Sequence, residues 1–549
     1  MATWLAIAAC LVGMVAAVTA ASPMDPHAVL QFGGKNNKNF YSLSRIRPCN
    51  VGKLVSYCNI TVDGEVSDGA SIVNGLLHVS TWSGTTLVVD VSTPACRVIA
   101  STFLPNQTGR SGVMTAYGST GTGSRNVPAL ALARNIQVIG DLSRAVIYGQ
   151  DMTTQRIVWQ TTLSNATATR ITGSQTISGD GQYVYAAVSS LEEGNPACFK
   201  QTPALCPFRG LVYKLRVADG AVVWRQQMAP GAETETMGYA GAAVWGGALL
   251  EWNNRLYVAT GNTYRLPDNV TACLAATNGS VSTCVDPMHM PDAIVCLDAT
   301  TGAVLWSHSF NLDVWTVACG PDHAPPGMFP MPTCDMDNQE DDADFGQGPM
   351  LLRATSPGRP YDVLMVGQKN GYVWTLNPYT GAVLRGVFVS PGSTVGGPLL
   401  GHAADNDRAY FGGANGRNVP FTMVNGMNCS SGALTAVDIR TGAIVWQLCD
   451  PHANRMYGFL AVTRGLVWAG SMAGDTDNLY AINAHTGAIV ATFYGKGSRI
   501  QAPVFYKNLM IAANGYTVPG YALGDNTIQV YALADADCDC DDDDNDAND

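Results

Sequence analysis

The chain has 549 residues, of which only 13% are charged, and it contains 58 glycines. A sparsely charged chain with this much glycine is ordered and rich in turns, so its composition excludes a disordered protein. The formal net charge is −12 and no basic cluster is present, which excludes nucleic acid as the main partner.

The first element is the apolar run "MATWLAIAACLVGMVAAVTAAS", which ends in small residues. Such a run is typical of a secretory signal, and we predict a signal peptide over residues 1–20. An uncleaved membrane anchor is the alternative. No later segment approaches the ~20 continuous apolar residues of a membrane span. We therefore expect a secreted, extracellular protein without a membrane span after signal removal.

Cysteines and glycosylation sequons agree with secretion. Removing Cys10 with the signal leaves fourteen of the 15 cysteines, an even number. Close pairs in a secreted chain predict small disulfide loops. The close pairs are Cys49 and Cys58, Cys198 and Cys206, Cys273 and Cys284, and Cys319 and Cys334. Sequons that predict a glycoprotein begin at Asn59, Asn106, Asn165, Asn269, Asn278 and Asn428.

One sequence pattern recurs through the rest of the chain. It reads "AIVCLDATTGAVLWSH" at 293–308, with close copies at 372–387, 433–448 and 478–493 and looser copies at 87–101, 145–160 and 211–226. Each copy predicts a strand, a tight turn at "TG" and a second strand, because glycine permits the positive φ of the turn. A tryptophan such as Trp306 can pack between neighbouring sheets. Another pair of strands precedes most copies, and units of four strands predict a β-propeller.

The number of units predicts eight blades. Seven copies can be counted, and an eighth blade can combine "TIQVYAL" (527–533) with N-terminal strands near "GASIVNGLLHVST" (69–81), which would close the ring. We predict an all-β protein, an eight-bladed propeller of four-stranded antiparallel blades over residues 30–533. The acidic tail over 534–549 should be disordered.

The repeat resembles that of quinoprotein dehydrogenases, which bind pyrroloquinoline quinone (PQQ). The segments between the repeats resemble the polyvinyl-alcohol dehydrogenase branch of that superfamily, over residues 110–533. They are "ITGSQTISGDGQYVYAAVSSLEE", "CPFRGLVYKL", "AVWGGALLEWNNRLYVATGN", "DVWTVACG", "DADFGQGPMLL" and "VGQKNGYVWTLNPYTG", in this order. The resemblance implies PQQ and calcium as cofactors and hydride transfer from an alcohol.

The carboxylate-rich stretch "DNQEDDADFGQGPMLL" (337–352) is either a solvated loop or the rim of a cation site. The family places an Asp-x-Asp before a blade strand, and the matching residues here are Asp342 and Asp344. By this resemblance, Asp342 is the catalytic base and also approaches the calcium ion, with Asp344 in support. Lys369 in "GQKNG" matches a cation that polarises the quinone carbonyl.

Further ligands follow from the same resemblance. Asn262 in "YVATGN" matches an asparagine whose oxygen binds calcium, and a simple Asn-Thr turn is its alternative. The segment "SSLEEG" offers Glu192 and Glu193 as the glutamate ligand, and the choice between them stays open. Trp245 in "AVWGG" matches the tryptophan under the flat quinone, with a blade-core tryptophan as the alternative.

Two arginines and two departures complete the comparison with the family. Arg125 in "SRNVPA" and Arg209 in "PFRG" match arginines near the cofactor carboxylates. Many members carry adjacent cysteines over the cofactor, whereas Cys198 and Cys206 are separated here and Pro207 follows. No Cys-x-x-Cys-His motif is present, so no covalent haem c is expected.

Two functions agree with these observations. The first is a secreted quinoprotein-like dehydrogenase that oxidises an alcohol or polyol, polymers included, and passes electrons to an external acceptor. The second is a non-catalytic PQQ-repeat propeller that binds a polymer or glycan or acts as a scaffold. A scaffold needs none of Asn262, Asp342 and Lys369, so their presence in register favours the enzyme.

Overall fold

The structure is a computed structural model. It describes residues 25–34, 37–111, 121–166, 168–192, 207–232, 234–247, 249–314, 342–356, 359–392, 395–517 and 523–534. The expected signal peptide, Glu193 and the acidic tail beyond residue 534 lie outside the described residues. So do two of the cysteine pairs, Cys198 with Cys206 and Cys319 with Cys334.

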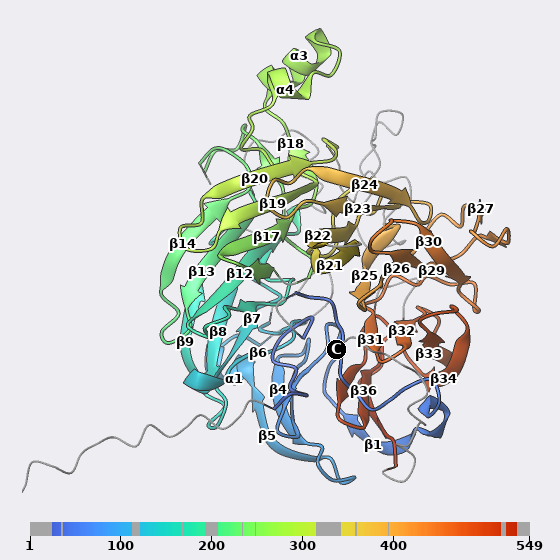
Figure 1. The fold of residues 1–549 in the computed structure, drawn as a ribbon. Coiled ribbons are helices and arrows are strands. Elements are labelled where there is room, and N and C mark those ends of the chain that lie inside the picture. The colour runs from blue at the N-terminus through green and yellow to red at the C-terminus, as the bar shows by residue number, and fades with distance from the viewer. Residues whose placement is uncertain are drawn as a thin grey trace, which may run out of the picture.

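Eight antiparallel sheets follow one another around a central axis, which confirms the predicted propeller (Figure 1). We number the blades in chain order and give their strands from the inside outwards. Blades one to four are β2 (Ser71–Val73), β3 (Leu76–Ser80), β4 (Thr85–Asp90), β5 (Arg97–Phe103); β6 (Ala129–Ala131), β7 (Ile136–Gly140), β8 (Val146–Asp151), β9 (Ile157–Thr162); β10 (Thr169–Arg170) with β11 (Thr176–Ile177), β12 (Tyr183–Ser190), β13 (Leu211–Arg216), β14 (Val222–Gln227); and β16 (Leu250–Trp252), β17 (Arg255–Ala259), β19 (Ala293–Asp298), β20 (Val304–Ser309). Blades five to eight are β21 (Met350–Ser356), β22 (Arg359–Gly367), β23 (Tyr372–Leu376), β24 (Val383–Phe388); β25 (Pro398–Ala404), β26 (Arg408–Gly413), β29 (Ala433–Asp438), β30 (Ile444–Cys449); β31 (Ala461–Thr463), β32 (Leu466–Gly470), β33 (Thr476–Asn483), β34 (Ile489–Gly495); and β35 (Val504–Tyr506), β36 (Leu509–Ala513), β37 (Thr527–Ala532), β1 (Val55–Thr61).

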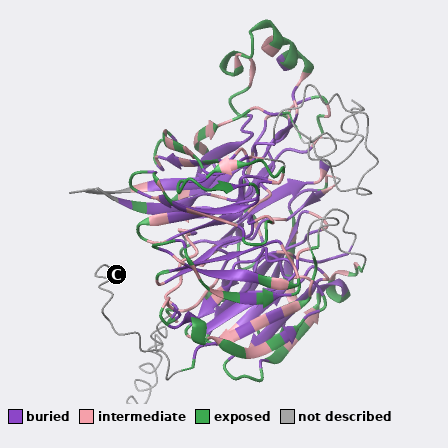
Figure 2. Cartoon of the chain, turned by 90° about the vertical axis from the view of Figure 1, so that its right-hand side faces the viewer, coloured by how far each residue is buried: buried purple, intermediate pink, exposed green. Residues whose placement is uncertain are grey.

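The remaining described elements are short and lie between strands. They are the helical turns η1 (Val51–Lys53) and η2 (Leu132–Arg134), the helices α1 (Leu104–Thr108), α3 (Asp268–Ala276) and α4 (Val281–Cys284), the pair β15 (Ala240–Gly241) and β18 (Thr263–Arg265), and the pair β27 (Phe421–Thr422) and β28 (Asn428–Cys429). Helices α3 and α4 form an exposed arm that projects from the ring (Figures 1 and 2). None of the described helices has the length and apolar character needed to cross a membrane.

The ring closes as expected at its C-terminal strand but with a different N-terminal partner. β37 lies in the eighth blade, as predicted, and pairs with β1, where Ile60 lies opposite Ile528. The expected partner near 69–81 instead forms the inner half of the first blade. In β1 only Ile60 is buried, so this outermost strand of the eighth blade has little apolar pattern.

The disulfides agree only in part with the close cysteine pairs expected from the sequence. The bond between Cys273 and Cys284 is confirmed, and it links α3 to α4 in the arm. The expected pair of Cys49 and Cys58 is wrong, because Cys58 bonds to Cys96 and so ties the closing strand to the first blade. A further bond joins Cys429 to Cys449.

Repeat tryptophans connect neighbouring blades. Trp224 of the third blade lies over Gly302, the turn glycine of the fourth, where φ is 78° and an added Cβ would lie 2.7 Å from the indole. The Trp224 indole also donates to the carbonyl of Ala299 at 3.2 Å. Trp306 and Trp446 donate in the same way to Pro378 and Ala484 of the blades that follow. The repeat therefore specifies each strand pair and also its contact with the next blade.

The N-terminal segment 25–46, which we call the strap, runs around the inside of the ring (Figure 1). It hydrogen-bonds in turn to blades one, two, three, five, six, seven and eight, and its contacts are Val29 with Ile72, Leu30 with Leu130, Gln31 with Ile177, Asn37 with Leu351, Asn39 with Ala404, Ser42 with Val462 and Arg45 with Lys507. Phe32 packs edge-on against Phe40 and against Phe459, with ring centroids 4.9 Å apart in both pairs. Because inner strands have free edges, the strap satisfies backbone groups that would otherwise be unpaired.

Candidate functional site

The candidate residues lie at equivalent ends of blade strands. Asn262, Lys369 and Glu192 each follow the second strand of a blade, namely β17, β22 and β12. Asp342 and Asp344 precede the first strand of the fifth blade, β21. In an antiparallel blade the start of the first strand and the end of the second are at the same end. All five positions therefore face one mouth of the ring.

A buried lysine holds two carboxylates together at this mouth. The Nζ atom of Lys369 lies 2.8 Å from Oδ2 of Asp342 and 2.6 Å from Oδ1 of Asp344. The side chains of Lys369, Asp342 and Asp344 are 9%, 0% and 4% exposed. The group is thus an ion triad inside the protein, and the alternative of a solvated loop is wrong for Asp342 and Asp344.

The triad alters the acidity of its members. Burial raises the pKa of Asp342 well above its usual value, the charge of Asp344 raises it further, and Lys369 lowers it. Burial lowers the pKa of Lys369, but the two carboxylates outweigh that effect and raise it above the usual value. The lysine is therefore charged and supports the ionised form of Asp342.

Trp245 lies against this triad. Its indole Nε1 donates to Oδ2 of Asp344 at 2.6 Å, and the Lys369 Nζ atom lies 5.0 Å from the ring centroid. Trp245 is only half-buried, at the margin of two core clusters. Gly261 permits this approach, because an added Cβ would meet the indole at 3.3 Å. Trp245 therefore has both an anchored edge and a partly free surface at the mouth.

The amide of Asn262 has a defined orientation. Its Nδ2 donates to Oδ2 of Asp313 at 2.8 Å and to Oδ1 of Asp342 at 3.2 Å. The two carboxyl oxygens accept these bonds, so the amide nitrogen faces them and the oxygen Oδ1 points away. Within the described part of the chain, no donor reaches that oxygen. Asn262 thus presents an unused neutral oxygen beside a carboxylate.

Glu192 is a buried acid with one unused oxygen. Its Oε2 accepts from the backbone N–H of Phe208 at 3.0 Å, whereas Oε1 has no partner among the described residues. Burial raises the pKa of Glu192 to about 8. The backbone connects it to Asn262 through Phe208, Gly241 and Ala242, so both belong to one hydrogen-bonded layer. No three Asp, Glu, His or Cys side chains in the described ranges are already gathered as a metal cluster.

Arg209 and Arg125 differ in their hydrogen-bond partners. The Arg209 guanidinium is fully buried and donates all five N–H groups to protein oxygens, at Pro207, Pro230, Ala232 and twice at Glu235. No donor is left for a cofactor carboxylate, so the expected cofactor role of Arg209 is wrong, and the side chain instead holds the 230–235 loop. Arg125 pairs with the buried Asp68 at 3.3 Å and remains at the mouth.

Two buried aspartates beside the site were not expected from the sequence. Asp313 accepts the Asn262 amide, and Asp292 is fully buried with both carboxyl oxygens unpartnered among the described residues. The segment "DVWTVACG" that carries Asp313 was already part of the family resemblance. An acid directly before a buried strand, as Asp292 is before β19, was the available signal for the second.

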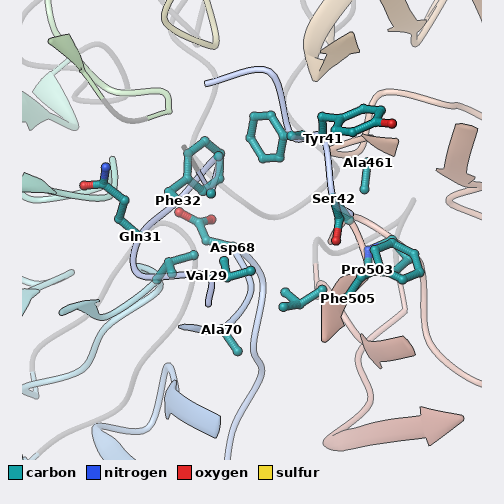
Figure 3. A pocket seen from close by; sticks show the side chains of 16 residues that line it. Val29, Gln31, Phe32, Tyr41, Ser42, Asp68, Ala70, Ala461, Pro503 and Phe505 are labelled. Carbon is teal, nitrogen blue, oxygen red and sulfur yellow. The ribbon is translucent and has the colours of Figure 1, made fainter. Parts of the chain in front are cut away.

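One described cavity, of about 60 Å³, lies inside the ring between the strap and the inner strands (Figure 3). Its wall is mainly apolar and carries Asp68. None of Asn262, Asp342 and Lys369 lines it. This cavity is therefore separate from the cluster around Lys369.

Comparisons with known proteins show what the chain is similar to. A model of PQQ repeats, described as outer membrane protein assembly factor BamB, matches residues 208–384 and 430–539, over half of the chain. The chain is 26% identical to a polyvinylalcohol dehydrogenase of Sphingopyxis sp. (strain 113P3) over 86% of its own length and 68% of the relative's. It is 27% identical to one of Pseudomonas sp., over 63% of this chain and 51% of that protein.

Solved structures show the same fold. The quinohemoprotein alcohol dehydrogenase ADHIIG of Pseudomonas putida HK5 superposes with a TM-score of 0.66 at 16% identity, over 93% of this chain and 80% of that one. The enzyme from Comamonas testosteroni gives 0.67 at 15% identity, over 92% and 80%. The chain belongs to the PQQ-repeat propeller family whose model it matches, within the superfamily of PQQ-dependent alcohol dehydrogenase-like proteins.

Proposed function

We propose that this chain is a secreted dehydrogenase that oxidises an alcohol with PQQ and calcium. The observation that carries the proposal is the buried triad of Asp342, Lys369 and Asp344 next to the oriented amide of Asn262. Burying such charges costs several kcal/mol per ion, which a purely structural propeller has no need to spend. The names of the two dehydrogenase relatives support the same chemistry, although the chain spans only about half of the second.

The residues present fit a calcium ion. Its ligands would be Oδ1 of Asn262, a carboxylate oxygen of Asp342 and Oε1 of Glu192, because calcium takes neutral and anionic oxygens together. Oε1 of Glu192 is buried without a partner among the described residues, and a cation would explain it. We accordingly choose Glu192 over Glu193 as the glutamate ligand.

The same residues fit a flat quinone. The indole of Trp245 would lie under its rings, Lys369 beside a carbonyl, and Arg125 near its carboxylates. When bound, PQQ supplies a carbonyl group that accepts hydride, and calcium supplies a charge that polarises that carbonyl.

The protein's own residues then have separate tasks. Asp342 accepts the hydroxyl proton of the alcohol, for which it must be ionised. Lys369 lowers the pKa of Asp342 and so favours that form, and Asp344 keeps Lys369 in place through its ion pair and its bond to Trp245. Burial of all three excludes water from the reacting atoms. The substrate is an alcohol or polyol, and a separate electron acceptor is required because the chain has no haem motif.

Secretion and glycosylation complete the proposal. The asparagines of all six sequons are exposed: Asn59, Asn106, Asn165, Asn269, Asn278 and Asn428. An exposed side chain is a requirement for modification by a glycan. Mass spectrometry of protein from a secreting host should show glycans at these sites, and unmodified asparagines throughout would contradict this part.

A non-catalytic propeller is the second candidate, and the description of the matching family as an assembly factor favours it. Purified protein supplied with PQQ and calcium separates the two. The enzyme should acquire quinone absorbance and then reduce an electron-accepting dye when an alcohol is added. If it takes up neither cofactor, the non-catalytic propeller is correct.

A further inference from the structure

Asp313 connects two parts of the candidate site that are distant in sequence. It follows β20 in the fourth blade and is only 2% exposed. Its Oδ2 atom accepts from Nδ2 of Asn262 at 2.8 Å and from the backbone N–H of Ala343 at 2.9 Å. Ala343 lies between Asp342 and Asp344, so one carboxylate oxygen holds both the amide and the backbone of the Asp-x-Asp.

The backbone of Asp313 strengthens the same connection. Its carbonyl accepts from the N–H of Thr263 at 3.2 Å, and Val314 pairs in parallel with Thr263. The residue next to Asn262 is therefore bonded to the main chain of Asp313 while Asn262 is bonded to its side chain. A shift of Asp313 would move the amide and the carboxylates relative to each other.

Without Asp313, the amide would lose its shorter hydrogen bond. Only the 3.2 Å bond to Asp342 would remain, and it ends on a carboxylate that the proposed function also assigns to the cation. The amide could then rotate and present its N–H group where an oxygen is required. The orientation of Oδ1 thus depends on Asp313.

Asp292 is a second buried carboxyl that interacts with Asp313. It is fully buried next to the Asn262 strand, where its backbone N–H bonds to the Gly261 carbonyl at 3.0 Å. Burial, followed by the charge of Asp313, raises the pKa of Asp292 well above its usual value.

We propose that Asp313 is a positioning residue that turns the Asn262 amide oxygen and the Asp342 carboxylate toward a shared cation. The inference rests on the proposed function, because it concerns the same cation. Asp313 acts through its hydrogen bonds to Asn262 and Ala343.

The test compares Asp313→Leu with Asp313→Asn by calorimetric titration of calcium into the full-length protein in the presence of PQQ. The leucine accepts no hydrogen bond, and loss of an orienting partner typically weakens metal affinity by about 10- to 100-fold. The asparagine carbonyl can accept both N–H groups, so this variant should bind calcium within a few-fold of the wild type. If Asp313→Leu does not fold, Asp313→Ala, which leaves room for water, should show the same loss.

Asp450→Asn is the matched control, since Asp450 is also buried and accepts three hydrogen bonds, but in the sixth and seventh blades. Its melting temperature should fall while its calcium affinity stays unchanged. Equal affinity of Asp313→Leu and the wild type would overturn the inference alone. Equally weak binding by Asp313→Asn and Asp313→Leu would also overturn it, because charge and not orientation would then matter. A wild type that binds no calcium would overturn the proposed function and this inference together.

Discussion

Lys369 ties the charge of Asp342 to that of Asp344, so each carboxylate can be changed without leaving the lysine unpaired. In Asp342→Asn the amide can still accept from Lys369, and Asp344 retains its ion pair at 2.6 Å. We expect this variant to fold and to bind PQQ, but to lose alcohol oxidation by about 10²- to 10⁴-fold, because an amide cannot accept the hydroxyl proton. Dye-linked turnover measured beside quinone absorbance checks both parts. Turnover close to that of the wild type would remove Asp342 from the role of base.

Lys38 of the strap provides a pH test that is independent of the cofactors. It is 2% exposed, its Nζ donates to the carbonyl of Phe32 at 3.0 Å, and burial lowers its pKa to about 7. Below about pH 7 both folded and unfolded chains carry the proton, so Lys38 adds no pH dependence there. Between that pH and the ordinary lysine value of about 10.4 the unfolded chain binds more protons, so stability should rise with pH.

The slope from Lys38 is at most about 1.4 kcal/mol per pH unit. The free energy of unfolding, measured from pH 7 to 9, should therefore rise more steeply for the wild type than for Lys38→Met. Methionine keeps most of the apolar stem without the titrating group. Parallel curves for the two proteins would show that Lys38 is not buried in this way.

At this scale the sequence predicted the members of the site better than their contacts. Asn262, Asp342 and Lys369 could be found because each ends or begins a strand in a recognisable segment, and a propeller brings such ends together. Arg209 was misassigned because its partners are loop carbonyls, which no motif records. Asp292 and Asp313 were missed because the burial of both, and the two hydrogen bonds that Asp313 accepts, are visible only after folding.

At the scale of elements, a turn glycine can be required for two separate reasons: its positive φ and its close contact with a tryptophan of the neighbouring blade. Gly302 and Gly181 both have positive φ, 78° and 69°, but only Gly302 has an indole within 4 Å of an added Cβ. Gly181→Ala should therefore cost only the backbone strain of about 1–2 kcal/mol. Gly302→Ala should cost that and a further ~1–3 kcal/mol for overpacking against Trp224. Thermal unfolding of the two variants checks the difference, and equal losses would contradict the inter-blade contact.

Whether an element could be predicted from the sequence depends on whether its partners are local or distant in the chain. Repeats with "TG" turns were located correctly because each carries its own strand pattern and turn. β1 and the strap were not, since neither has a clear period. Both obtain their hydrogen bonds from strands at the far end of the chain or on other blades, and such non-local partners leave no local signal.

At the scale of the whole molecule, ring closure joins residues from both ends of the chain. The disulfide of Cys58 and Cys96 links the eighth blade to the first, whereas that of Cys273 and Cys284 lies in the arm outside the ring. Replacing Cys58 and Cys96 by serine should lower the stability of the ring by about 2–4 kcal/mol. The same change at Cys273 and Cys284 should leave the melting temperature of the ring almost unchanged. Equal losses of stability in the two double variants would show that the disulfide at the closing blade does not specifically stabilise the ring.

Residues from the third, fourth and fifth blades would hold one calcium ion next to the site for the quinone. A crystal structure of the protein with PQQ and calcium, with the ion located by anomalous scattering, tests it most directly. We predict an ion ~2.3–2.6 Å from Oδ1 of Asn262, a carboxylate oxygen of Asp342 and Oε1 of Glu192, with the quinone lying on Trp245. An ion bound elsewhere, or no quinone beside Trp245 and Lys369, would contradict the claim.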